Sequence, residues 1–163
     1  MNQSSSGRAM ASSAALAGTA LHFLHNWLPN PLTALFAPVN ESVWEHLKLL
    51  FWPYLGAAWL LVRREEHPWQ AWTGHLAALL VMPLILLGAH YALRSGFRMS
   101  GLEIDLTLYY LTLTLGFVLA YHTGRSPRAA RLAGPLLLTA AVYAVLLTVF
   151  TFAAPALPVF EAP

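Results

Sequence analysis

The segment PVNESVWEHLK at residues 38–48 places ionisable side chains directly before a long apolar run. In a helix, at about 100° per residue, Glu41, Glu45 and Lys48 lie within about 60° of one another. Ser42 and His46 are four residues apart and form a neighbouring stripe. Carboxylates, an imidazole and an amine gathered in this way can bind a cation, relay a proton or activate a water molecule.

Ionisable residues elsewhere in the chain are expected at the same end of the molecule. The first apolar run contains His22 and His25 near its end, the third ends with His90, and the fourth begins with Glu103 and Asp105. Because bundles build metal sites from carboxylates and imidazoles of separate helices, we predict one polar pocket here. The candidate ligand-binding residues are Asn40, Glu41, Ser42, Glu45, His46, Lys48 and Asp105. The candidate metal ligands are His22, Glu41, Glu45, His46 and Asp105.

Three interpretations of the segment remain open. The first is structural: SVWE at 42–45 matches the capping box S-x-x-E, in which Ser42 and Glu45 satisfy the first amides of a helix. The second is a binding site for a divalent metal, a proton or a small polar solute. The third is a membrane-embedded metal-dependent hydrolase, with Glu45 as the base and Lys48 or His46 stabilising an oxyanion.

The composition indicates a membrane protein. Of the 163 residues, 58% are hydrophobic and only 10% are charged, whereas a soluble domain carries about 25% charged residues. The arginines stand in short clusters between apolar runs, which is typical of orientation signals and not of a nucleic-acid surface. The absence of Cys excludes disulfides and thiolate metal sites. A haem is not expected, because only His22 with His46 or His90 could supply two axial ligands.

Five apolar segments are each long enough for the roughly 20 residues that a membrane span requires. They cover residues of about 10–28, 42–62, 69–92, 103–122 and 131–152. We read the first as an uncleaved span, because no small-residue cleavage site follows it. Residues 29–41 are too few to cross and too apolar for an exposed loop, so we expect an interfacial or re-entrant segment. The predicted fold is an all-α polytopic membrane helix bundle, a single domain over residues 1–163.

The basic residues divide unequally between the two sides that five spans define. One side carries Arg8, Arg63, Arg64, Arg125, Arg128 and Arg131, and the other carries Lys48, Arg94 and Arg98. By the positive-inside rule we expect the N-terminus in the cytoplasm and the C-terminus outside. Residues 38–48 then lie at the outer end of the second span, with Glu45 roughly one turn and Lys48 nearly two turns inside the hydrocarbon. Charges at such a depth usually face the bundle interior and pair with one another.

A family resemblance rests on three stretches, HFLHNW at 22–27, PVNESVWEHLKLLFWP at 38–53 and FTFAAPALPVF at 150–160. They resemble a family of small bacterial multi-spanning membrane proteins that is known only as a domain of unknown function. The matching positions are His22, Trp27, Pro38, Asn40, Glu41, Ser42, Trp44, Glu45, His46, Lys48, Pro53, Asp105, Pro155, Pro158 and Phe160. The chain departs from the family in two places: His25-Asn26 stands where the family has Tyr-Glu, and the tail is shorter. The resemblance implies the fold and brings no activity with it.

We therefore expect an integral protein of the bacterial inner membrane that binds or moves a metal ion, a proton or a small polar solute in its outer pocket, and not an enzyme. One alternative is a non-catalytic accessory subunit of a larger respiratory or photosynthetic membrane complex, and a second is the metal-dependent hydrolase. The expected partners are the lipid bilayer and either such a complex or further copies of the chain, without nucleic acid. A divalent metal is the cofactor that the sequence suggests.

Overall fold

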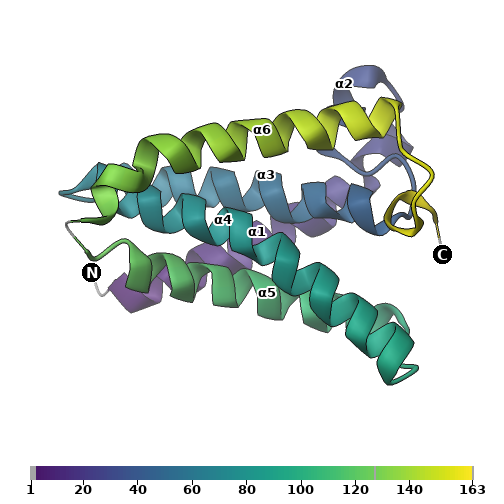
Figure 1. Ribbon diagram of the computed structural model, residues 1–163, viewed down its shortest axis with the longest axis horizontal. Coiled ribbons are helices and arrows are strands. Elements are labelled where there is room, and N and C mark those ends of the chain that lie inside the picture. The colour runs from purple at the N-terminus through teal and green to yellow at the C-terminus, as the bar shows by residue number, and fades with distance from the viewer. Residues whose placement is uncertain (1–2, 127, 163) are drawn as a thin grey trace.

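The computed structural model describes residues 3–126 and 128–162, and the regular structure in these ranges is entirely helical (Figure 1). The main helices are α1 (Gln3–Trp27), α2 (Pro31–Phe36), α3 (Val43–Val62), α4 (Pro68–Tyr91), α5 (Leu102–Thr123) and α6 (Ala133–Phe152). The short elements are a π-helical turn η1 (Ala92–Gly96) and two 3-10 turns, η2 (Ala129–Leu132) and η3 (Pro158–Phe160). The prediction of an all-α fold is confirmed for the described residues.

Proline and glycine mark several helix boundaries. Helix α2 begins at Pro31 and α4 begins at Pro68, where proline fits because the first amide of a helix has no partner within the helix. Helix α5 begins after Gly101, whose φ of 141° suits glycine and strains other residues. Asn30 caps α2, because its Oδ1 accepts hydrogen bonds from the amides of Leu32 at 2.9 Å and Thr33 at 3.0 Å.

The five long helices lie side by side, and α2 lies near the end of the bundle where α6 ends (Figure 1). Helices α3 and α4 contact each other, and both contact α5 and α6; α3 also contacts α1. Helix α1 begins at the end of the bundle opposite to the one where α6 ends (Figure 1). Helix α3 contributes most to the core among the described helices, because 11 of its 20 residues are buried.

Three of the described helices are long and apolar enough to cross a membrane. They cover Pro68–Gly96, Leu102–Thr123 and Ala129–Phe152. Their outer surfaces carry large apolar side chains, among them Leu84 at 70% exposed and Leu138 at 68%. Apolar surface of this extent on a water-soluble protein marks an interaction site, and a lipid bilayer satisfies it along whole helices.

The prediction of five spans is thus supported by hydropathy for three helices, and α1 and α3 do not qualify. The first two turns of α3 contain Glu45, His46 and Lys48, which lower its mean hydropathy, and the first half of α1 is rich in serine. Helix α3 is packed against α1, α4, α5 and α6. A helix enclosed by protein does not need the uniform hydropathy of one that faces lipid.

Candidate functional site

The polar residues of segment 38–48 gather where α3 begins, near α2 and the end of α6 (Figure 1). Ser42 is the N-cap of α3, and its Oγ accepts a hydrogen bond from the amide of Glu45 at 3.3 Å. The amide of Ser42 donates to Asn40 Oδ1 at 2.9 Å. The predicted cap at Ser42 is therefore present, but Asn40 takes the place that a capping box would give to Glu45.

Glu45 and Lys48 form a buried ion pair with a distance of 2.7 Å between Lys48 Nζ and Glu45 Oε2. Glu45 is 2% exposed and Lys48 is fully buried. The lysine also donates to the carbonyl oxygens of Ala34 at 2.7 Å and Ala37 at 3.4 Å. The same carboxylate oxygen of Glu45 accepts a hydrogen bond from the amide of Val39 at 2.9 Å. The pair thus binds α2 and the segment that follows it to α3.

The second carboxylate oxygen of Glu45 faces α6. Thr151 Oγ1 lies 3.0 Å from Glu45 Oε1 and 2.8 Å from the carbonyl oxygen of Leu147. A hydroxyl group has one proton, so it donates to one of these two acceptors at a time. Glu45 therefore has polar partners on α3, on the segment before it and on α6.

Small residues on α1 bring His22 against α3. A Cβ at Gly18 would clash with the Tyr109 hydroxyl of α5 and come within 3.1 Å of the carbonyl oxygen of Leu49 on α3, so glycine favours the close approach of α1 to both helices. His22 lies one turn beyond Gly18 on the same face of α1. As a result, the ring centroids of His22 and His46 are 5.3 Å apart.

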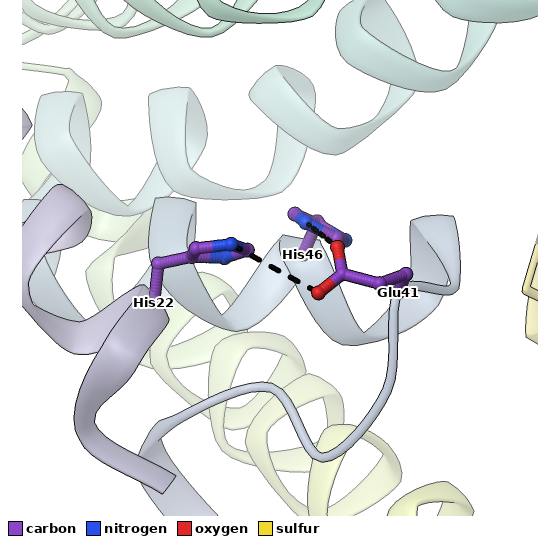
Figure 2. A group of neighbouring side chains, drawn as sticks. All are labelled: His22, Glu41 and His46. Atoms are coloured by element: carbon purple, nitrogen blue, oxygen red, sulfur yellow. Dashed lines mark ion pairs between the residues drawn. The ribbon is translucent and has the colours of Figure 1, made fainter. Parts of the chain in front are cut away.

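His22, Glu41 and His46 form a cluster between α1 and α3, in which the carboxylate of Glu41 faces both rings (Figure 2). Glu41 Oε1 lies 3.9 Å from His22 Nε2, and Glu41 Oε2 lies 3.4 Å from His46 Nε2. One ligand atom from each of the three residues lies within 4.8 Å of the other two. The side chain of Glu41 is 64% exposed, so water and ions reach the cluster.

A hydrogen bond to the backbone fixes the protonation of one ring nitrogen. His46 Nδ1 lies 2.8 Å from the carbonyl oxygen of Ser42. A carbonyl oxygen only accepts, so Nδ1 carries the proton and donates it. In the neutral ring, Nε2 then presents a lone pair toward the carboxylate of Glu41. Two acceptors facing each other at 3.4 Å repel, unless a proton or a metal ion lies between them.

Only three of the five predicted metal ligands lie close to one another. Asp105 Oδ1 lies 3.4 Å from His90 Nδ1, at the turn between α4 and α5. In Figure 1 this turn lies apart from α2 and the end of α6. Glu45 faces Lys48 instead of the histidines. The structure therefore brings together His22, Glu41 and His46 and leaves Glu45 and Asp105 in separate ion pairs.

Two contacts that were not predicted hold α2 in place. His25 Nδ1 lies 3.0 Å from Thr33 Oγ1, and Trp52 Nε1 donates to the carbonyl oxygen of Leu35 at 3.0 Å. Both contacts join residues from different helices. Their only signal in the sequence is a polar atom on an otherwise apolar helix, which does not identify a partner.

A second polar group lies in the middle of the bundle. The Tyr54 hydroxyl lies 3.1 Å from His75 Nδ1 and 3.3 Å from the carbonyl oxygen of Gly116. Tyr54 is fully buried, and its ring packs against Phe117 with centroids 4.7 Å apart. This contact gives His75 of α4 a hydrogen-bond partner on α3.

Residues 11–162 match the model of a family described as a family of unknown function, DUF6512, so the chain belongs to that family. Comparison with curated proteins and with solved structures gives no match.

Proposed function

We propose that this member of DUF6512 is an integral membrane protein that binds a divalent transition-metal ion at the outer end of its bundle, through His22, Glu41 and His46. The hydrogen bond from His46 Nδ1 to the Ser42 carbonyl carries the proposal. It aims Nε2 of His46 at the Glu41 carboxylate, so that in the neutral ring both groups can donate a lone pair to one shared cation. Metal-binding histidines typically donate their other ring nitrogen to a carbonyl or carboxylate in this way.

The donor set suits zinc. Two imidazoles and one carboxylate are the ligands of many zinc sites that keep a fourth position open. At bond lengths of about 2.0–2.2 Å in a tetrahedron, ligand atoms lie about 3.4 Å apart. The three atoms of the cluster lie within 4.8 Å of one another, so they need to approach by about 1.4 Å at most. Glu41 is the most exposed of the three side chains and can make this adjustment.

The proposal is binding and not hydrolysis. The hydrolase interpretation assigned Glu45 as the base, but this carboxylate accepts hydrogen bonds from Lys48 and from the Val39 amide. Lys48 donates to Glu45, Ala34 and Ala37. Neither group is free to act on a substrate near the cluster.

The proposed topology has five crossings, with α1 and α3 crossing inside the bundle beside the three apolar helices. The N-terminus lies in the cytoplasm and the C-terminus outside, as the arginine distribution favours. The start of α1 and the end of α6 lie at opposite ends of the bundle (Figure 1), which supports an odd number of crossings. In this topology the metal binds on the outer side of the membrane.

Zinc binding by the full chain in detergent tests the proposal, with the metal content measured by mass spectrometry after equilibration against a weak chelator. We expect one zinc per chain, and its loss in His22→Ala and His46→Ala. His90→Ala is the matched control, because His90 also faces a carboxylate, that of Asp105, but lies outside the cluster.

Equal zinc content in all four proteins, or none in the unaltered chain, would overturn metal binding. If the unaltered chain holds no zinc and the cluster takes up a proton on acidification, the cation shared by His46 and Glu41 is a proton. If the chain instead remains in a larger assembly on extraction, the accessory-subunit interpretation takes the place of this proposal.

A further inference from the structure

We propose that the buried Glu45–Lys48 pair positions the metal ligand Glu41 and links it to the end of α6. The inference rests on the proposed metal site at His22, Glu41 and His46. It assigns a role to two charged residues whose ion pair is separate from those of the three proposed metal ligands. In this role the pair acts through the backbone that carries Glu41.

Glu41 depends on this backbone because it does not belong to a helix. It lies in the segment of residues 37–42, between α2 and α3. A ligand on a helix keeps its direction through the helix, whereas a ligand on a connecting segment needs contacts that fix the segment. The contacts that hold residues 37–42 therefore determine whether Glu41 is preorganised for metal binding.

The ion pair holds this segment at two points. Lys48 Nζ lies 3.4 Å from the carbonyl oxygen of Ala37, at the start of the segment. Glu45 Oε2 accepts a hydrogen bond from the amide of Val39 at 2.9 Å, two residues before Glu41. Beyond Glu41, the Ser42 cap fixes the chain to α3. The position of Glu41 is thus set from both sides.

Apolar residues of similar size would fill the same space without providing these contacts. They would offer no acceptor to the Val39 amide and no donor to the carbonyl oxygens of Ala34 and Ala37. A buried ion pair adds little net stability compared with such residues, and specifying one arrangement is a role found for such pairs in some proteins. Here the specified arrangement is that of residues 37–42 on α3.

The end of α6 is connected to the same pair. Thr151 on α6 lies 3.0 Å from Glu45 Oε1. The ring of Trp44, next to Glu45, packs against Phe150 of α6 and Phe160 of η3, with centroids 5.5 Å and 4.9 Å apart. A displacement of the end of α6 therefore reaches Glu45, and through Glu45 the backbone before Glu41.

The test uses the full chain in detergent and measures the dissociation constant for zinc by competition with a chromophoric chelator. The variants are Glu45→Gln, which removes the charge and keeps the size, and Thr151→Val, which removes the hydroxyl group of α6 that contacts Glu45. The matched control is Thr148→Val. Thr148 is also partly buried on α6, but its hydroxyl donates to the carbonyl oxygen of Ala144 and not to Glu45.

Glu45→Gln is expected to weaken zinc binding by about 10–100-fold, the range typical of groups that orient a metal ligand. Thr151→Val should weaken it several-fold, and Thr148→Val should leave it unchanged. Hydrogen exchange gives a second readout. Zinc should slow exchange of the amides of residues 37–42 in the unaltered chain, and this effect should be smaller in Glu45→Gln. A merely structural role would lower the unfolding temperature without changing the affinity of the folded protein.

Each outcome is decisive. If the unaltered chain binds no zinc, the proposed function fails and this inference fails with it. If the unaltered chain binds zinc and both Glu45→Gln and Thr151→Val bind it within twofold as tightly, only the positioning role is overturned. If Glu45→Gln does not fold, the comparison of Thr151→Val with Thr148→Val decides. Weaker binding in Glu45→Gln alone would keep the positioning role and refute the link to α6.

Discussion

Replacing Lys48 with methionine tests the account of the buried ion pair. Methionine keeps most of the volume and removes the ammonium group. Glu45 then remains buried at 2% exposure without its counter-charge, and the carbonyl oxygens of Ala34 and Ala37 lose their donor. Breaking a buried ion pair by removing one partner costs about 3–5 kcal/mol. An orphaned buried acceptor costs about 1–3 kcal/mol more where water cannot reach it.

We therefore expect Lys48→Met to lower the free energy of unfolding by at least about 3 kcal/mol. The assay is reversible denaturation in mixed micelles, followed by tryptophan fluorescence. The double variant Glu45→Gln with Lys48→Met is the control, because it removes the unpaired charge. It should be more stable than Lys48→Met alone. A loss of unfolding free energy below about 1 kcal/mol for Lys48→Met is the size expected of an exposed pair. It would refute the claim that the buried Glu45 depends on Lys48 as its counter-charge.

Three further predictions concern the cap, the core and the metal. Ser42→Ala should lower the free energy of unfolding by about 0.5–2 kcal/mol through loss of the α3 cap, measured in the same micelles. Tyr54→Phe should cost about 1 kcal/mol, the net value of one hydrogen bond, and stability equal to that of the unaltered chain would argue against the contact with His75. Zinc binding should release protons and weaken on acidification, because imidazole binds metal only when unprotonated. A pH-independent affinity in a competition titration would contradict imidazole ligands.

The positions of the helices were predictable from the sequence. The predicted segments 42–62 and 69–92 correspond to α3 at Val43–Val62 and α4 at Pro68–Tyr91. Apolar runs, together with proline and glycine at their ends, determine where a helix begins and ends, so these boundaries need no knowledge of the fold. The sequence did not predict that α3 is enclosed by other helices, because charged residues in an apolar segment do not show whether that segment faces lipid or protein.

The site was predictable only as a set of residues at one end of the molecule. His22, Glu41 and His46 were expected together and lie together. The sequence could not separate them from Glu45 and Asp105, because pairing depends on which faces of the helices meet. The contact between Glu45 and Thr151 joins residues 106 positions apart. No local pattern carries that information.

X-ray absorption at the zinc edge, on the full chain loaded with one equivalent of zinc, tests the central claim most directly. The spectrum reports the atoms bound to the metal. Two imidazole nitrogens and oxygen ligands at about 2.0–2.2 Å are predicted, and this imidazole scattering should be lost in His46→Ala together with the bound zinc. A spectrum without imidazole scattering, or one unchanged in His46→Ala, would contradict a metal site at His22, Glu41 and His46.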